Sequence, residues 1–398
     1  MDYYVMKAHP ARNTKDMRRG PGNRREAPSR RLAARLCAAV LVLAAAAAPL
    51  AGCNDDKTLT ETINRALRES SIPGVIVGVW REGEPPYVRA FGVQDTATGE
   101  PMSTDLYMRI GSNTKAFVVT SILILADQDQ LDLGDPIGLY VEGVPNGDKI
   151  TLRQLAQMRS GLFSYSDVTI PDIWKEPFRE WTPQELLEIS FSHPPLFPPG
   201  SEFDYSNTNT VLLGLVVEKV SGQTLASFIG ENILEPLGLT RTVFPSGAEI
   251  PSPHSQGYFK LPDGEFVDAT DWNPSWGWAA GNMISTLDDM GVWARALATG
   301  KLISPAMKKE QHRFLPAPEE GDGALYGLAL ENQNGWLGHN GNILSYLVYP
   351  YYLPSERITL VVMANTGDIL GSWRMMQEIT RIISPDHPWP GLPLPPNE

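Results

Sequence analysis

The stretch that decides the fold is residues 111–126, which read Gly-Ser-Asn-Thr-Lys-Ala-Phe-Val-Val-Thr-Ser-Ile-Leu-Ile-Leu-Ala. Beyond Lys115 the apolar residues run almost all round the helical circumference, so the sequence predicts a helix over 113–126 that is buried at the centre of a sizeable domain. Ser112 and Lys115 are three positions apart and would share one face of its first turn. The free N–H groups and the dipole of a helix N-terminus favour negative charge at Ser112.

This Ser-x-x-Lys pair has a chemical interpretation and a structural one. A serine is a weak nucleophile until a neighbouring base takes its proton, and a partly buried lysine with a lowered pKa can act as that base. In the structural interpretation, Ser112 caps the helix and Lys115 is an ordinary first-turn residue.

The elements on either side of this helix define the fold class. β-rich runs at 74–80 and 87–93 flank a Glu-Gly-Glu-Pro-Pro turn and predict a hairpin, and two more strands are predicted at 343–352 and 357–364. Helical patterns fill the middle at 152–158, from 183, at 208–220, 222–230 and 286–298, and a last one covers 368–383. We therefore expect an α+β fold, with an antiparallel sheet of N- and C-terminal strands flanked by helices and a helix-rich middle subdomain.

Two further motifs carry polar groups that suit catalysis. Tyr205-Ser206-Asn207 lies in a Pro-Gly-rich loop, where the Tyr can relay a proton and the Asn can bond a substrate amide and the lysine. His339-Asn340-Gly341 precedes the strand at 343, where the Gly lets a substrate backbone approach and the strand can offer an N–H to an oxyanion. Each motif alone is equally compatible with an ordinary turn.

Composition narrows the function. The formal net charge of −13 argues against nucleic acid as the main partner. Cys37 and Cys53 are the two cysteines, which excludes a Cys-rich zinc module or a disulfide scaffold in the main body. The histidines lack metal-ligand spacing, so we predict neither a metal nor a cofactor.

The first 52 residues differ from the rest. Ten Lys and Arg against three acids give them +7, which leaves −20 on the remainder. An Arg-rich run and an apolar run over 36–50 form a secretory signal pattern that is too short for a comfortable membrane span. The run ends in Leu-Ala-Gly-Cys53, which resembles a bacterial lipobox. We expect residues 1–52 to be a lipoprotein signal peptide, Cys53 to be the lipid anchor to the membrane, and the protein to lie outside the cytoplasm in a bacterial cell envelope. An uncleaved anchor helix is the alternative. Residues 53–60 are predicted as a tether, 61–385 as the hydrolase domain and 386–398 as a Pro-rich tail.

Together and in this order, the three motifs resemble those of the penicillin-recognising serine hydrolases. The closest likeness is to the branch of class C β-lactamases, serine D-Ala-D-Ala carboxypeptidases and family VIII esterases. Flanking text agrees, including residues 109–115, 131–136, 152–162, 236–239 and 279–286. The resemblance covers about residues 58–383 and implies a two-subdomain β-lactamase-like fold.

The resemblance also implies a role for each motif residue. Ser112 would be the acylated nucleophile, Lys115 its activator, and Tyr205 the general base or proton shuttle. Asn207, His339, Asn340, Gly341 and Asn342 would bind substrate, with the N–H groups of Ser112 and Asn342 forming the oxyanion hole.

The substrate is less defined. The favoured prediction is carboxypeptidase-like or β-lactamase-related hydrolysis of a small peptide, amide or ester, with a peptidoglycan stem peptide as one candidate. Asn340 departs from the Thr or Ser that commonly binds a substrate carboxylate in the third motif. A family VIII-type carboxylesterase and a catalytically silent cell-wall-binding lipoprotein are the alternatives.

Overall fold

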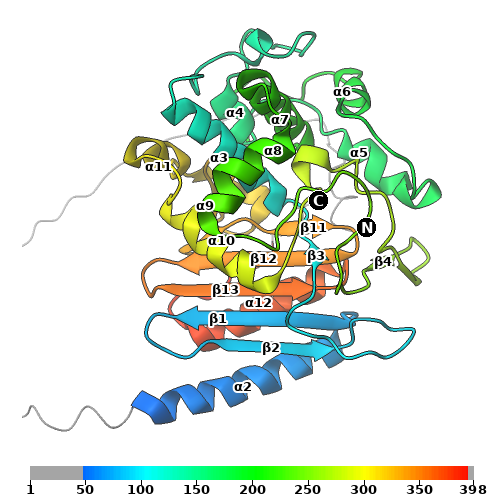
Figure 1. The fold of residues 1–398 in the computed structure, drawn as a ribbon, viewed down its shortest axis with the longest axis vertical. Helices are drawn as coiled ribbons and strands as arrows, with labels where there is room; N and C mark the ends of the chain where they lie inside the picture. The colour runs from blue at the N-terminus through cyan, green and yellow to red at the C-terminus, as the bar shows by residue number, and fades with distance from the viewer. Residues whose placement is uncertain (1–47, 393–398) are drawn as a thin grey trace, which may run out of the picture.

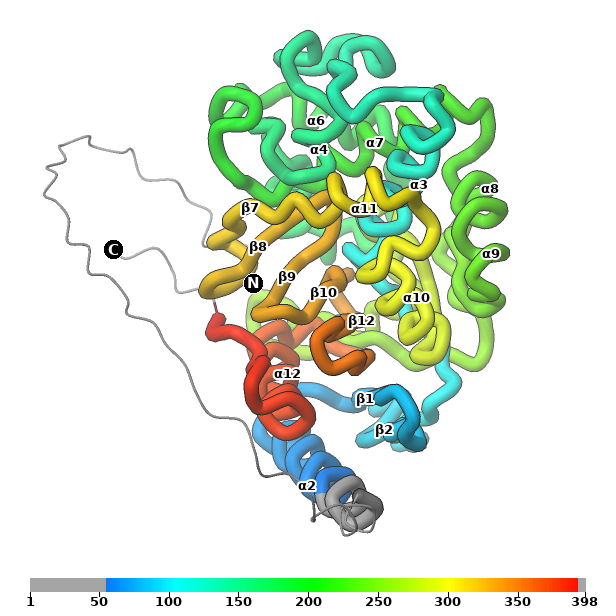
Figure 2. Tube along the Cα trace, turned by 90° about the vertical axis from the view of Figure 1, so that its left-hand side faces the viewer, coloured from blue at the N-terminus to red at the C-terminus, as the bar shows by residue number. Residues whose placement is uncertain are grey.

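The computed structural model describes residues 48–392, and side chains from Asp55 onward. A central sheet separates two layers of helices (Figure 1). On one face lie α2 (Ala48–Glu69) and α12 (Ile369–Ile383), and on the other lie α10 (Leu287–Thr299) and the helix-rich half of the molecule. Turned by 90°, the molecule again shows the helical half above the strands, with α12 to the left of β1 and α2 at the bottom (Figure 2). The expected α+β class is confirmed.

The helices of the helix-rich half and its connections are short apart from α3 and α7. They are α3 (Asn113–Asp127), α4 (Leu152–Ala156), α5 (Ser166–Thr169), α6 (Pro183–Phe191), α7 (Asn207–Ser221), α8 (Leu225–Ile229), α9 (Glu235–Leu237) and α11 (Pro305–Gln311). Short 3₁₀ helices are η1 (Ile137–Leu139), η2 (Ile170–Lys175), η4 (Trp278–Ala280) and η5 (Pro318–Glu320), and η3 (Gly230–Leu234) is a short π-helix.

The main sheet has nine strands in the order β2-β1-β13-β12-β10-β9-β8-β7, and β11 also pairs with β12. Their bounds are β1 (Gly74–Arg81), β2 (Tyr87–Gly92), β7 (Leu315–Pro316), β8 (Leu325–Tyr326), β9 (Glu331–Gln333), β10 (Trp336–Gly338), β11 (Gly341–Ile343), β12 (Tyr346–Leu353) and β13 (Ile358–Ala364). Two small sheets pair β3 (Met108–Arg109) with β6 (Ile284–Ser285), and β4 (Tyr258–Lys260) with β5 (Phe266–Asp268).

The N- and C-terminal strands pair within this one sheet, next to its β2 edge, as expected. β1 pairs antiparallel with β13, with Val75 opposite Ala364, and β13 pairs with β12. Every residue of β12 and β13 is buried, because helices cover both faces. The strand predicted at 343–352 is confirmed over most of its length as β12, but it begins later than expected. Leu344 adopts a positive φ of 53°, so residues 341–343 form a separate strand, β11, that pairs with β12 as a hairpin.

The buried central helix is confirmed. Residues 113–125 of α3 are all buried, and the helix packs against α7. Within residues 48–392 no single helix is long and apolar enough to cross a membrane. Only α7 and the helical segment Leu225–Leu237, taken together, reach the required length and apolar character, and the two are bent by 81° relative to each other. Most of α7 is buried in the same core as α3.

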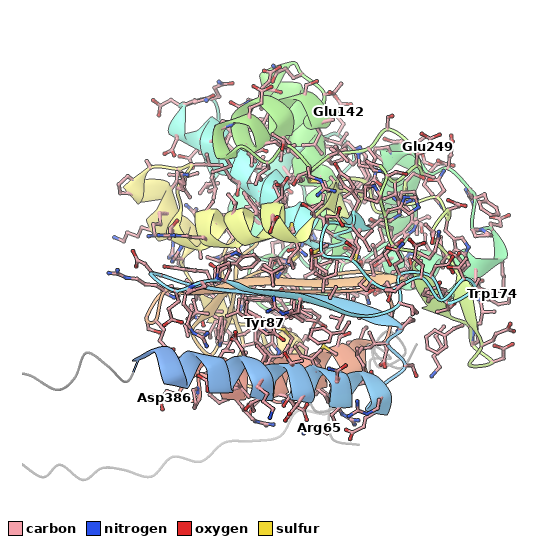
Figure 3. The ribbon with its side chains drawn as sticks, turned by 60° about the horizontal axis from the view of Figure 1, so that its bottom comes forward. Arg65, Tyr87, Glu142, Trp174, Glu249 and Asp386 are labelled. Atoms are coloured by element: carbon pink, nitrogen blue, oxygen red, sulfur yellow. The ribbon has the colours of Figure 1, made fainter. Side chains whose placement is uncertain are left out.

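Residues 53–60 were expected to form a tether, but the structure places them in the helix α2. The prediction of a tether is therefore wrong. Leu59 is 2% exposed and Ile63 is fully buried, and both belong to the core between the sheet, α2 and α12. Tyr87 lies between the sheet and α2 (Figure 3), and its hydroxyl is 2.9 Å from that of Thr60. The helix persists because it buries this apolar face. Residues 1–47 of the predicted leader lie outside the part of the chain that the structure describes. Cys53 lies in α2, but its side chain is not among those described.

The Pro-rich tail is also more structured than expected. Trp389 is 2% exposed and makes edge contacts with Trp373 and Tyr351. The indoles of Trp336 and Trp373 donate to the carbonyls of His387 and Pro390. Residues up to 392 therefore belong to the folded body.

Candidate active site

Ser112 stands at the N-terminus of α3, but it does not cap the helix. Its backbone is already helical (φ −61°, ψ −10°), and its side chain makes no capping hydrogen bond. Instead the Lys115 Nζ donates to the Ser112 Oγ at 2.8 Å. Ser112 is partly exposed, so a substrate can reach the hydroxyl, whereas Lys115 is fully buried. This geometry favours the chemical interpretation of the Ser-x-x-Lys pair.

The surroundings of Lys115 lower its affinity for a proton. Its Nζ also donates to the Ala280 carbonyl at 2.8 Å and lies 4.9 Å from the centroid of the Tyr205 ring. Burial lowers the pKa of Lys115 to about 7, against the opposing fields of Glu320 and Glu331. A substantial fraction of the amine is therefore neutral near pH 7 and can accept the Ser112 proton.

Tyr205 reaches the nucleophile from the loop before α7. Its phenol hydrogen-bonds the Ser112 side chain. Burial first, then the neighbouring Tyr326 and Glu320, raise the pKa of Tyr205 well above its ordinary value, and the Ser112 bond only partly offsets this. The phenol is therefore protonated at neutral pH and suits a proton relay rather than a phenolate base.

Asn207 begins α7 on the same side, but its contacts differ from the expectation. Its Nδ2 donates to the Ser166 Oγ at 2.8 Å, and its backbone N–H donates to the Ser164 Oγ at 3.1 Å. The hydrogen bonds described for Lys115 go to Ser112 and Ala280 instead of Asn207. Ser166 thus holds the Asn207 side chain, and Ser164 holds its backbone N–H.

Two side chains of the third motif, His339 and Asn340, contact buried partners. His339 is 1% exposed, and Tyr326 lies 2.9 Å from its Nε2. The Asn340 Nδ2 donates to both carboxylate oxygens of Glu331, at 3.2 and 3.3 Å. His339, predicted to bind substrate, is therefore shielded from solvent in this structure.

The strand β11, which begins at Gly341 of the third motif, lies directly against the turn at residues 110–113 that carries Ser112. Gly111 has a φ of +50°, and a Cβ there would lie only 2.6–2.8 Å from the Asn342 backbone. A Cβ on Gly341 would collide with the Ile110 carbonyl oxygen. The approach of a substrate backbone at Gly341 stays a prediction, and the group that comes close to Gly341 in the structure is the Ile110–Asn113 turn. Two glycines thereby bring the Asn342 backbone beside Ser112, where its N–H is predicted to serve.

Three neighbours of the site were missed by sequence reasoning: Ala280, Tyr326 and Glu331. None has a local signature, since each is brought to the site by a distant segment. Ala280 does fall in the 279–286 stretch that contributed to the family resemblance, which was the available signal.

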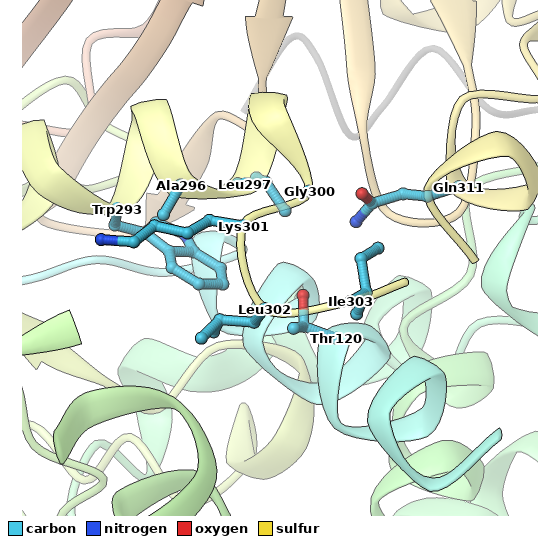
Figure 4. Close-up of a pocket in the computed structure, with 9 residues that line it drawn as sticks. All are labelled: Thr120, Trp293, Ala296, Leu297, Gly300, Lys301, Leu302, Ile303 and Gln311. Atoms are coloured by element: carbon cyan, nitrogen blue, oxygen red, sulfur yellow. The ribbon is translucent and has the colours of Figure 1, made fainter. Parts of the chain in front are cut away.

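Two small cavities lie in the body, and neither has room for a substrate. One lies between α3 and α10 and is lined by Thr120, Trp293 and Gln311, among others (Figure 4). Its volume of about 10 Å³ is about the room for one water molecule. Among residues 48–392 no three His, Cys, Asp or Glu side chains are grouped to hold a metal ion.

Comparison with known proteins finds similar folds and similar sequences. The solved structure of a D-stereospecific amidohydrolase from Streptomyces sp. is similar, with a TM-score of 0.73 and 28% identity over 83% of this chain and 99% of that one. D-amino acid amidase from Ochrobactrum anthropi SV3, complexed with L-phenylalanine, gives 0.72 and 25% over 79% and 93%. Among curated proteins, Protein flp of Staphylococcus aureus (strain MRSA252) is 26% identical over 78% of this chain, and Putative penicillin-binding protein PbpX of Bacillus subtilis (strain 168) is 26% identical over 77% of this chain and 73% of its own length.

The match spans only 63% of the length of the first of these curated relatives. The sequence profile described as Beta-lactamase, however, matches residues 59–378, which is most of this chain and contains all three motifs. The chain therefore belongs to the Beta-lactamase family of serine hydrolases.

Proposed function

We propose that this protein hydrolyses an amide bond in a small peptide or amino acid amide through an acyl-enzyme on Ser112. The observation that carries the proposal is the 2.8 Å hydrogen bond between a buried Lys115 amine, with its pKa lowered to about 7, and a partly exposed Ser112 hydroxyl. The amidase and amidohydrolase structures similar to this chain support an amide as the substrate class.

In the proposed first step the Lys115 amine accepts the Ser112 proton while Oγ attacks the substrate carbonyl carbon. The N–H groups of Ser112 and Asn342 stabilise the resulting oxyanion, a contribution of about 10²–10³ in rate for one such donor. The C–N bond then breaks, and the leaving amine receives a proton relayed from Lys115 through the Tyr205 phenol. A water molecule then attacks the acyl carbon and gives its proton through the Tyr205 phenol to Lys115. The ester bond to Ser112 Oγ breaks, Oγ takes the proton back from Lys115, and the acid product leaves.

The test is a panel of purified-enzyme assays with D- and L-amino acid amides, D-Ala-D-Ala peptides, p-nitrophenyl esters and nitrocefin. We expect turnover of amides, with Ser112→Ala losing it. Turnover of esters alone would favour the carboxylesterase alternative. Equal turnover by wild type and Ser112→Ala, or none in the wild type, would overturn the proposal.

We also propose that Cys53 is lipidated and anchors the protein to the membrane of a bacterial cell envelope. The support is the basic leader and the Leu-Ala-Gly-Cys53 sequence. Removal of residues 1–52 would retain Leu59 and Ile63, which pack α2 on the sheet. Expression in a bacterium with labelled palmitate should label the wild type but not Cys53→Ser, and label in neither would contradict the anchor.

A further inference from the structure

A fully buried carboxylate, Glu331 on β9, lies directly behind the third motif. It accepts hydrogen bonds from four groups: the Asn340 backbone N–H at 3.2 Å, the Asn340 Nδ2 at 3.2 and 3.3 Å, the Gln333 Nε2 at 3.3 Å, and the Tyr351 hydroxyl. All four are donors, which is the set that an ionised, acceptor-only carboxylate requires. Glu331 thereby joins β9, β12 and the turn between β10 and β11.

The same carboxylate fixes the His339 ring. Its Nδ1 lies 2.6 Å from the Asn340 carbonyl oxygen and 3.3 Å from the Glu331 Oε1, and both are acceptors. The hydrogen therefore resides on Nδ1, and Nε2 accepts from the Tyr326 hydroxyl at 2.9 Å. Burial lowers the pKa of His339, and Lys115 adds to this, while the field of Glu331 and the bond to the Asn340 carbonyl only partly oppose it, so the imidazole is neutral at pH 7. The third motif presents no positive charge.

Glu331 also determines where the Asn340 amide points. This side chain occupies the position that commonly carries a substrate-facing hydroxyl in similar motifs, but here its Nδ2 is directed to both oxygens of Glu331. The amide is committed to a buried partner, and releasing it would leave a buried carboxylate with fewer donors. A substrate carboxylate arriving at the third motif would meet neither a charged imidazole nor this amide, and it would approach the Glu331 carboxylate.

We propose that Glu331 is a positioning and specificity-determining residue that holds His339 and Asn340 away from substrate and makes the site discriminate against substrates bearing a carboxylate beside the scissile bond. The inference rests on the proposed function. Its substrate class is an amide, or an ester, whose leaving group is uncharged. The negative charge of Glu331 would repel a substrate carboxylate, and no donor of the third motif is free to bind it. Both effects lower the affinity for a carboxylate substrate.

The experiment uses one scissile bond with two leaving groups. D-Ala-D-Ala and D-Ala-D-alaninamide, each offered free and N-acetylated, are cleaved at the same bond and followed by release of D-alanine or D-alaninamide. We expect wild-type kcat/KM to favour the carboxamide by about tenfold or more, the scale of a like-charge penalty. In Glu331→Gln this preference should fall by about tenfold. In Asn340→Thr, which frees the position and adds a hydroxyl, it should fall in the same direction.

The matched control is Glu265→Gln, an exposed carboxylate in the turn between β4 and β5, which should leave the preference unchanged. The ratio is measured within one sample, so a loss of folded enzyme cancels. If Glu331→Gln does not fold, Asn340→Thr decides. An unchanged preference in folded variants whose Ser112 still reacts with a fluorophosphonate would overturn the role of Glu331 while leaving the proposed function intact. A wild type whose Ser112 does not react would instead overturn the proposed function.

Discussion

Lys115 is fully buried, and its ammonium form is penalised by that burial while its neutral form suits proton transfer. The Ser-x-x-Lys spacing predicted that Ser112 and Lys115 would meet. It could not predict that the Ala280 carbonyl would hold the amine, or that Tyr326 and Glu331 would flank the site, because these residues come from segments more than 160 positions away. The direction of the pKa shift was expected from partial burial, and its size comes from the complete burial.

The first prediction concerns pH. If the neutral amine is the base, kcat/KM for an amide should rise with pH through an apparent pKa of about 7, because protonation below that value removes the acceptor. A pH–rate profile between pH 5 and 9 measures this limb. A flat profile across this range would show that Lys115 does not gate the reaction.

The second prediction is that Lys115→Met trades activity for stability. Activity should fall by about 10²–10⁴, the range for losing a general base. At pH 7 the free energy of unfolding should rise, because burial penalises the ammonium form that Met lacks.

Proton linkage gives this stability difference a pH dependence. The folded-state pKa of Lys115, about 7, lies below its ordinary value of 10.5. The unfolded chain therefore binds more protons between these values, and wild-type stability gains with rising pH across that window. The advantage of Lys115→Met should shrink from pH 7 toward 10, measured by denaturant unfolding, and a constant difference would argue against the lowered pKa.

At the scale of elements, the site depends on β11 lying against the turn before α3. The sequence predicted the buried helix and a strand near residue 343, since both have strong local patterns. It did not predict β7 to β10, because strands of two or three residues carry little periodicity. Nor could it predict that Gly341 accommodates the Ile110 carbonyl, since that contact is between distant segments.

The third prediction tests this contact. Gly341→Ala should push β11 away from Ser112 and lower kcat by about 10²–10³, the cost of losing one oxyanion donor. Gly247→Ala is the matched control, because a Cβ there meets no atom within 4 Å and its φ is not positive. Steady-state kinetics of both variants decide the matter: equal kcat values would contradict the role of β11.

At the scale of the whole molecule, α2 and residues 386–392 help to close the face of the sheet opposite the site. α2 packs on α12, and residues 386–392 cover Trp336 and Trp373. Composition predicted a tether over 53–60 and a tail over 386–398, because polar and Pro-rich sequences are typical of linkers. Burial of a few isolated apolar residues, Leu59, Ile63 and Trp389, outweighed that composition.

The fourth prediction is that Trp389→Ala destabilises the fold by about 3–5 kcal/mol, as for other buried Trp truncations. Trp174 is 37% exposed and lies at the periphery (Figure 3), so Trp174→Ala should change stability by under about 1 kcal/mol. Denaturant unfolding of both variants provides the comparison. Equal losses would mean that residues 386–392 do not stabilise the body.

The most direct test of the central claim is covalent labelling of the full chain with a fluorophosphonate, followed by mass mapping of the modified residue. The account predicts one adduct, on Ser112, with labelling that accelerates as pH rises through about 7 and is lost in Ser112→Ala. Folded wild-type protein with no adduct, or with an adduct on another residue that persists in Ser112→Ala, would contradict it.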